Sequence, residues 1–329
     1  MQEKINRRDH LLETVSNKYE GSTHMAKTEF RLTAPFLAKI FNIKTKWGIY
    51  ILQLIAGFLF FGFLTVLLLL LTNDKGITFL FAMAFGFIYP GYSFVAEMEG
   101  FFDSFAFLFL LIAMLDINIM FIALAFFFAF WTDERAILAS SLVLFWWQYQ
   151  QNVKTKKSFF LPALQSFAFG FSLFIYLLLR WYLILHYGFK NQFAGAGLTV
   201  LGYTINYAGI VFWQAFEGFW LFLPIALYQL YCSKKYLIGI VFIMLNAALF
   251  LGALTVMGIT RSMAYIFPSI IIAFYIAKES FEVTELKRLM AIVLLFCFVY
   301  PSYSFIVGKG PHPYNPIYMR ATKKLLHID

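Results

Sequence analysis

Residues 47–72 read WGIYILQLIAGFLFFGFLTVLLLLLT and contain no charged side chain. The hydrocarbon core of a bilayer accepts an α-helix of about 20 consecutive apolar residues, within a range of about 17–25. A helix satisfies its own backbone hydrogen bonds where no water is present. The stretch therefore predicts a membrane-spanning helix.

The rest of the chain has the same apolar character. Apolar residues make up 61% of the 329 residues, against about 45–50% in ordinary soluble domains, and charged residues make up 13%, against about 25%. A soluble fold of this size needs far more polar side chains to cover its surface. The composition excludes an ordinary soluble enzyme, a disordered chain and a nucleic-acid-binding domain, so nucleic acid is not an expected partner. We expect an all-α, polytopic transmembrane helical bundle of about ten membrane segments.

Polar segments divide the chain. Residues 1–29 form a polar N-terminal flank, residues 47–306 a single transmembrane domain, and residues 307–329 a polar C-terminal tail. Before the first span, residues 30–46 read FRLTAPFLAKIFNIKTK, in which apolar side chains recur at helical spacing with lysines between and after them. This pattern predicts an interfacial amphipathic helix, which lies in the membrane surface and does not cross it.

Residues 104–131 leave two interpretations open. They form either one tilted helix, which gives nine spans, or two short helices that turn at residues 116–118 (DIN), which gives ten. A charge at the bilayer centre costs about 2.5–3.5 kcal/mol, which favours the turn. Nine spans instead place the basic N-terminal flank in the cytoplasm, as the positive-inside rule prefers. Both interpretations place the basic loops near Lys154, Lys234 and Lys287 in the cytoplasm. Only the two-helix interpretation places the acidic loop at residues 97–103 on the outer side, together with residues 133–135 and Arg261.

Acidic side chains gather at the expected membrane boundaries. Glu97, Glu99 and Asp103 fall within seven residues, and in a helix Glu99 and Asp103 would share one face. Adjacent carboxylates provide a base with a raised pKa or hold a divalent cation, so these three are the catalytic candidates. The alternative is a short solvated loop. No His or Cys cluster predicts a further metal site, and no other cofactor is indicated.

Residues 132–135 read TDER, a polar break between two apolar segments. Thr132 is a candidate cap for the following helix, with Asp133 and Glu134 in its favourable first turn. Arg135 at the start of a membrane helix suggests an anionic partner, which is either one of these two carboxylates or a lipid phosphate.

Two further charges belong to the expected site. Arg261, in residues 260–262 (TRS), either holds a phosphate together with the neighbouring hydroxyls or extends to the membrane interface. Glu217 lies within the expected span 207–231, where it pairs with an arginine, titrates, or sits near the outer surface. The candidates for binding phosphate or substrate are Arg135, Arg261, Asp133, Glu134 and Glu217.

The order of these parts resembles a known family. FRLTAPFLAK is followed by an acidic loop, AEMEGFFDSF, by two short apolar segments and by TDER. Over residues 28–150 this order resembles polytopic membrane glycosyltransferases of the GT-C type, especially mannosyltransferase-like ones. The resemblance implies transfer of a sugar from a polyprenyl-phosphate-linked donor at the outer face, in cell-envelope glycan synthesis at the bacterial cytoplasmic (inner) membrane. It also implies membrane lipids and a lipid-linked sugar as partners, Glu97, Glu99 or Asp103 as the base, and Arg135 and Arg261 as holders of the donor phosphate.

Two other functions use the same residues differently. In a transporter, a flippase or a polysaccharide polymerase-like protein, Glu217 and Arg261 would line a polar pathway. In a non-catalytic membrane assembly subunit, the charges at the membrane boundaries could be substituted without loss of function.

Overall fold

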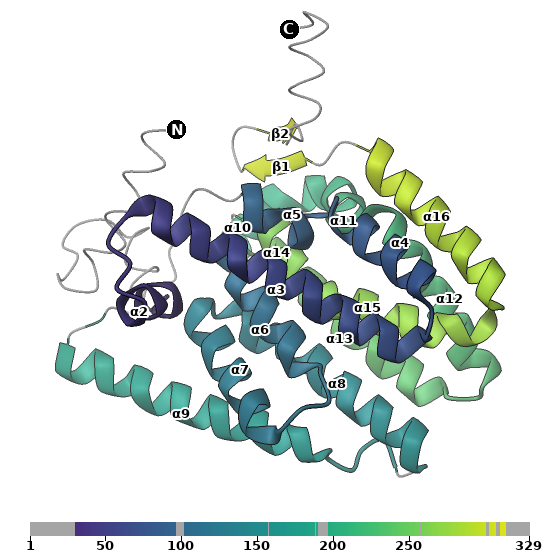
Figure 1. The fold of residues 1–329 in the computed structure, drawn as a ribbon, viewed down its shortest axis with the longest axis horizontal. Helices are drawn as coiled ribbons and strands as arrows, with labels where there is room; N and C mark the ends of the chain where they lie inside the picture. Colours follow the sequence, from purple (N-terminus) through teal and green to yellow (C-terminus); the bar gives the residue numbers. More distant parts are fainter. Residues whose placement is uncertain are drawn as a thin grey trace, which may run out of the picture. The chain divides into compact units, whose positions relative to one another are not determined.

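The computed structural model describes residues 30–96, 102–156, 158–187, 189, 197–256, 258–300, 303–306 and 310–313 (Figure 1). Within this part the chain is helical, apart from an antiparallel pair of short strands, β1 (Tyr303–Ile306) and β2 (Gly310–Pro313). The predicted helical class is therefore confirmed. The chain forms two compact units, Met1–Leu67 with Ser93–Gly195, and Leu68–Tyr92 with Ala196–Asp329.

The first unit is built around a helical hairpin. Helix α6 (Asp103–Ala113) turns into α7 (Ile119–Thr132), and α7 packs on both α6 and α9 (Leu164–Tyr187). Helix α8 (Arg135–Thr155) follows and contacts all three. The hairpin and α9 therefore form a small bundle closed by α8.

Side-chain hydrogen bonds join two further helices to this unit. The short helix α2 (Thr33–Ile40) packs on α7, where the Thr33 hydroxyl donates to the Phe128 carbonyl oxygen at 2.8 Å. The long helix α3 (Lys46–Thr72) meets α5 (Tyr89–Ala96), where the Gln53 amide donates to the carbonyl oxygens of Ser93 and Phe94. Helix α2 thus covers about half of residues 30–46, where the sequence predicts the interfacial helix, and α3 is the helix that residues 47–72 predict.

The second unit surrounds α15 (Phe267–Ala277), a helix with almost no exposed residue. Helix α12 (Phe222–Cys232) packs along α15, and α16 (Val283–Val299) packs along α4 (Lys75–Phe85). Buried phenylalanine rings fill the interior of this unit. Its other helices are α10 (Leu198–Thr204), η2 (Ile205–Tyr207), α11 (Ala208–Phe216), η3 (Glu217–Leu221), α13 (Tyr236–Leu254), α14 (Ile259–Ala264) and η4 (Lys278–Ser280).

Fewer helices could cross a membrane than the sequence predicts. By length and composition, five in the described part qualify, or up to six if the bent pair Lys75–Phe85 and Tyr89–Val95 is one span. The predicted count of nine or ten is higher because it includes short apolar segments that form helices of 11 and 14 residues, α6 and α7. The five are Trp47–Thr72, Leu164–Tyr187, Leu198–Cys232, Tyr236–Leu254 and Ile259–Ser280.

The structure decides between the two interpretations of residues 104–131. The chain turns between Ala113 and Ile119, so the single tilted helix is wrong. The Asn118 side chain accepts a hydrogen bond from the Met120 backbone N–H at 2.9 Å and caps α7. Asp116 lies exposed in the turn, 3.7 Å from the Lys154 ammonium, so its charge is not buried.

Two tryptophans of α8 donate hydrogen bonds to carbonyl groups at the end of α6. The last carbonyl groups of a helix have no partner within it. The Trp147 indole N–H donates to the Ala113 carbonyl oxygen at 2.8 Å, and Trp146 donates to Met114 at 2.9 Å. Both indoles are buried, so they satisfy carbonyl groups that the turn would otherwise leave without a partner.

Two expected loops are partly helical. Residues 151–157 read as a polar, basic loop, but α8 continues through them to Thr155. Residues 181–206 read as an outer loop, but α9 extends to Tyr187 and α10 begins at Leu198. At residues 151–155 the polar and basic side chains lie on a part-exposed helical turn, so their composition resembles that of a loop.

Candidate functional site

The candidate site of the first unit lies where three helix ends meet. Asp103 is the first residue of α6, Asp133 directly follows α7, and Arg135 is the first residue of α8. The Asp133 carboxylate accepts the Arg135 backbone N–H at 2.9 Å. Thr132 does not cap α8 as expected, because its hydroxyl donates to the Phe128 carbonyl oxygen within α7. The TDER break is thus a tight junction in which Asp133 takes the capping role.

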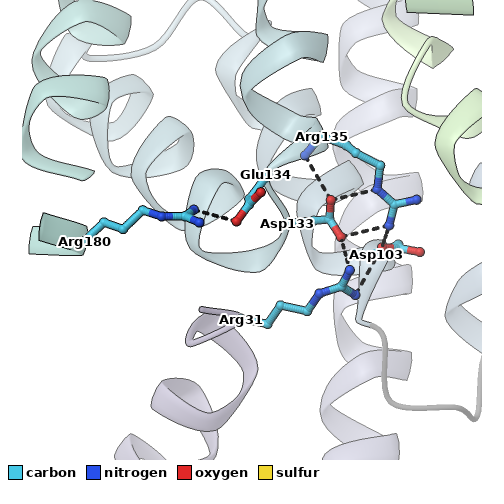
Figure 2. Close-up of polar contacts among 6 residues, drawn as sticks. All are labelled: Arg31, Asp103, Asp133, Glu134, Arg135 and Arg180. Atoms are coloured by element: carbon cyan, nitrogen blue, oxygen red, sulfur yellow. Dashed lines mark hydrogen bonds and ion pairs between the residues drawn. The ribbon is translucent and has the colours of Figure 1, made fainter. Parts of the chain in front are cut away.

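Four charged side chains converge at this junction, and we call them the ion cluster: Arg31, Asp103, Asp133 and Arg135 (Figure 2). Arg135 holds both carboxylates. Its Nε and Nη2 atoms lie 2.7 and 2.8 Å from the two oxygens of Asp133, and its Nη2 lies 2.9 Å from Oδ1 of Asp103. Arg31 arrives from the segment before α2, with Nη2 2.6 Å from Oδ2 of Asp133 and Nη1 4.0 Å from Oδ1 of Asp103.

Burial and charge explain why these four residues stay together. The side chains of Asp103 and Asp133 are 0% and 3% exposed, whereas those of Arg31 and Arg135 are 18% and 16% exposed. A buried carboxylate is tolerated when it is paired and hydrogen-bonded. Two arginines and two aspartates balance in charge, and the arginines form the part of the cluster that faces the surroundings.

A second ion pair lies beside the ion cluster. Glu134 points away from Asp133 and its Oε1 lies 2.5 Å from Nη1 of Arg180 on α9 (Figure 2). Arg180 also donates to the Tyr176 hydroxyl, and its guanidinium lies 4.1 Å from the centre of the Phe30 ring. The contact with Phe30 is of the cation–π type. Arg180 therefore ties α9 to the segment that carries Arg31.

The structure brings together some of the predicted site residues. Asp103, Asp133 and Arg135 meet in the ion cluster, and Glu134 lies next to it. Glu97 and Glu99 lie outside the described residues. Arg31 and Arg180 were not predicted, because an arginine near a membrane boundary does not by itself indicate which carboxylate it pairs with.

Glu217 and Arg261 belong to the second unit. Glu217 is fully buried and interrupts the predicted span 207–231, since α11 ends at Phe216 and Glu217 has a φ of 48° and a ψ of −121°. Its carboxylate interacts with the Cys297 thiol of α16. At Gly218, a Cβ atom would lie 2.9 Å from the Val293 carbonyl oxygen, so the close approach of η3 to α16 requires glycine.

Arg261 sits in α14 between two buried hydroxyl side chains, Thr260 and Ser262. The α14 helix packs on α11 and α13. The TRS motif is therefore part of the packed interior of the second unit.

No group of three or more metal-ligating side chains occurs among the described residues. In the ion cluster the two aspartates face arginines, which is a poor arrangement for a cation. The described part of the site is better suited to an anion, since guanidinium groups match the geometry of phosphate and carboxylate oxygens.

Comparisons with known proteins found no relative. No protein-family model matches the chain, and no curated protein or solved structure is significantly similar to it.

Proposed function

We propose that the chain is a membrane glycosyltransferase of cell-envelope glycan synthesis, located in the bacterial cytoplasmic membrane, which takes its sugar from a polyprenyl-phosphate-linked donor. The observation that carries the proposal is the contact between Asp103 and Arg135, 2.9 Å apart, in a cluster with Arg31 and Asp133. A carboxylate and guanidinium groups are the two kinds of side chain that this reaction requires. The resemblance to GT-C enzymes over residues 28–150 supports the same reaction.

The reaction assigns one task to each kind of side chain. The hydroxyl oxygen of the acceptor forms a bond to the anomeric carbon, and the bond from that carbon to the phosphate oxygen breaks. The electron pair leaves on the phosphate, whose charge the arginines stabilise. The acceptor proton passes to a carboxylate, for which Asp103 is the described candidate. Atoms and charges balance without any further reactant.

Transfer of labelled sugar from a polyprenyl-phosphate donor, measured in purified membranes, tests this proposal. Asp103→Asn keeps the shape of the side chain and removes the base, so transfer should fall by about 10²–10⁴-fold, the range typical of general base catalysis. Asp116→Asn is the matched control, because Asp116 is the exposed aspartate at the other end of α6. Unchanged transfer in the Asp103 variant would show that Asp103 is not the base, and absence of transfer by the unchanged chain would favour a non-catalytic assembly subunit.

One observation favours a second candidate, a transporter or flippase. Glu217 is buried at the break between α11 and η3, and interrupted helices with a polar group at the break are typical of substrate and ion sites in transporters. Glu217→Gln would then abolish movement of the lipid-linked sugar across vesicles, while Asp103→Asn would leave it intact. The opposite pattern supports the glycosyltransferase.

A further inference from the structure

We propose that the donor phosphate replaces Asp133 as the partner of Arg31, and that this exchange frees a carboxylate of the ion cluster to act as base. The inference rests on the proposed function and explains how it can work. In the structure both aspartates are paired and buried, which is unsuitable for a base. An incoming phosphate is an anion that can compete with a carboxylate for a guanidinium group.

The two arginines are held in different ways, and this difference identifies Arg31 as the exchangeable one. Arg135 is fixed at the start of α8, where its backbone N–H, Nε and Nη2 all bond to Asp133 within one turn of chain. Arg31 precedes α2 and lies outside the helices of the described part. Its shortest observed ion pair, 2.6 Å, joins it to a carboxylate about a hundred residues away in the chain.

Exchange leaves the aspartates short of positive charge. Two arginines balance two aspartates in the observed arrangement. Once Arg31 faces a phosphate, the other three residues of the ion cluster, Asp103, Asp133 and Arg135, carry one net negative charge. A carboxylate that shares one guanidinium group with a second carboxylate is less fully paired and can accept a hydrogen bond from the acceptor hydroxyl. We assign the role of base to Asp103, because Arg135 bonds to Asp133 through its backbone N–H, Nε and Nη2 and to Asp103 through Nη2.

The surroundings of Arg31 permit such an exchange. Its guanidinium belongs to the exposed part of the cluster, so an anion can approach it without unfolding the helices. Phe30, next to it in the chain, stays in place beneath the Arg180 guanidinium. The movement is therefore confined to one long side chain on an anchored segment.

Binding of geranyl phosphate to the protein in phosphatidylcholine nanodiscs tests the exchange, with geraniol and inorganic phosphate as separate probes of the two parts of the ligand. Arg31→Ala should weaken binding about tenfold or more, because a charge-assisted pair is lost. Asp133→Asn should tighten binding about fivefold or more, because the competing carboxylate is gone. Lys39→Ala, which removes an exposed charge from α2, and Asp116→Asn are the matched controls and should leave binding unchanged.

Kinetics add a readout that a purely structural role would not produce. In the transfer assay, Asp133→Asn should lower both KM for the donor and kcat, since the phosphate binds more tightly and the remaining Asp103–Arg135 pair is neutral. Melting curves of each variant show that it is folded, and Arg31→Lys provides a milder substitution should Arg31→Ala unfold.

The outcomes separate the two proposals. If Arg31→Ala weakens binding but Asp133→Asn does not tighten it, the exchange is overturned and phosphate binding at the cluster stands. If geranyl phosphate binds with equal affinity to Arg31→Ala, Arg31→Lys and the unchanged chain, the exchange is overturned, and the transfer assay alone decides the proposed function. If geranyl phosphate does not bind at all, both the exchange and the proposed function are overturned.

Discussion

At the scale of single residues, the molecule contrasts buried ion pairs with exposed ones. Asp103 and Asp133 are buried against Arg31 and Arg135, whereas Asp116 has an exposed lysine partner. Desolvation makes a buried charge costly once its partner is removed, while an exposed pair is screened by water. Removing one partner of an ion pair should therefore destabilise the protein much more at the buried start of α6 than at the exposed turn after it.

Replacing Arg135 tests this contrast. Arg135→Met leaves two buried carboxylates to share Arg31, so we expect a loss of about 3–5 kcal/mol in the free energy of unfolding. Lys154→Met removes the exposed partner of Asp116 and should cost about 0–1 kcal/mol. Thermal unfolding in detergent measures both, and equal melting temperatures would contradict the buried cluster.

Asp74 provides a pH-dependent prediction. The hydrogen bond from Lys287 and that from the Ile77 backbone N–H lower the pKa of Asp74 below its ordinary value of 3.8. Because the folded pKa is depressed, the stabilisation is present above the unfolded pKa and is lost as the pH falls through the folded pKa. Asp74→Asn, which keeps an oxygen to cap α4, should lower the melting temperature equally at pH 7 and pH 5. The difference should shrink only below about pH 3.8.

At the scale of secondary-structure elements, the α6–α7 hairpin shows what a sequence pattern leaves undecided. Residues 104–131 are apolar apart from Ser104 and the turn residues Asp116 and Asn118, so their composition suits one long helix or two short ones. The chain forms the exposed turn because three contacts stabilise it. Asp116 pairs with Lys154, Asn118 caps α7, and α8 supplies hydrogen-bond donors to the carbonyl groups at the end of α6. The last of these comes from a helix that follows later in the chain, and no local pattern indicates it.

The indole donors of α8 can be tested one atom at a time. Trp147→Phe keeps the aromatic ring but leaves the Ala113 carbonyl oxygen without its N–H donor, which should cost about 1–3 kcal/mol in the free energy of unfolding. Trp181→Phe is the control, since Trp181 lies exposed on α9 and should change stability little. Denaturation in detergent distinguishes the two, and a Trp147 variant as stable as the control would show that the bond is dispensable.

At the scale of the whole molecule, the second unit has one end at which three turns meet. The Lys278 ammonium donates to the Leu71 carbonyl oxygen, Lys287 lies 2.8 Å from Asp74, and the Ser280 hydroxyl bonds to Gln229 at 2.8 Å. These contacts place the turns after α3, α12 and α15 together. Lys234 and Lys235 follow α12, so these four lysines gather at one end of the unit, as the positive-inside rule expects of a cytoplasmic face.

Chemical labelling of the native Cys232 shows which side of the membrane this end of the second unit faces. Cys232 is exposed beside the turn after α12, and α13 is long and apolar enough to cross the membrane. A membrane-impermeant maleimide should label Cys232 only from the cytoplasmic side. In a Cys232→Ser background, Gly258→Cys, beyond the other end of α13, should be labelled only from the outer side. Labelling of both positions from one side would show that α13 does not cross.

The sequence predicted part of the candidate site. Asp103, Asp133 and Arg135 were expected to matter because charges are rare in this chain and these lie at helix boundaries. Their mutual contacts were not expected, because Asp103 and Arg135 are separated by the whole hairpin. Arg31 lies even further away in the chain, and its pairing with Asp133 depends on how α2 packs on α7.

The amino-acid sequence by itself determined the class of this protein. Long apolar runs without charges force helices that suit a membrane, because the backbone there must satisfy its own hydrogen bonds. Only the tertiary structure decided where those helices break and which charges meet. A short apolar run suits one helix or half of a hairpin equally well, and a buried charge finds its partner through packing between segments that are distant in the chain.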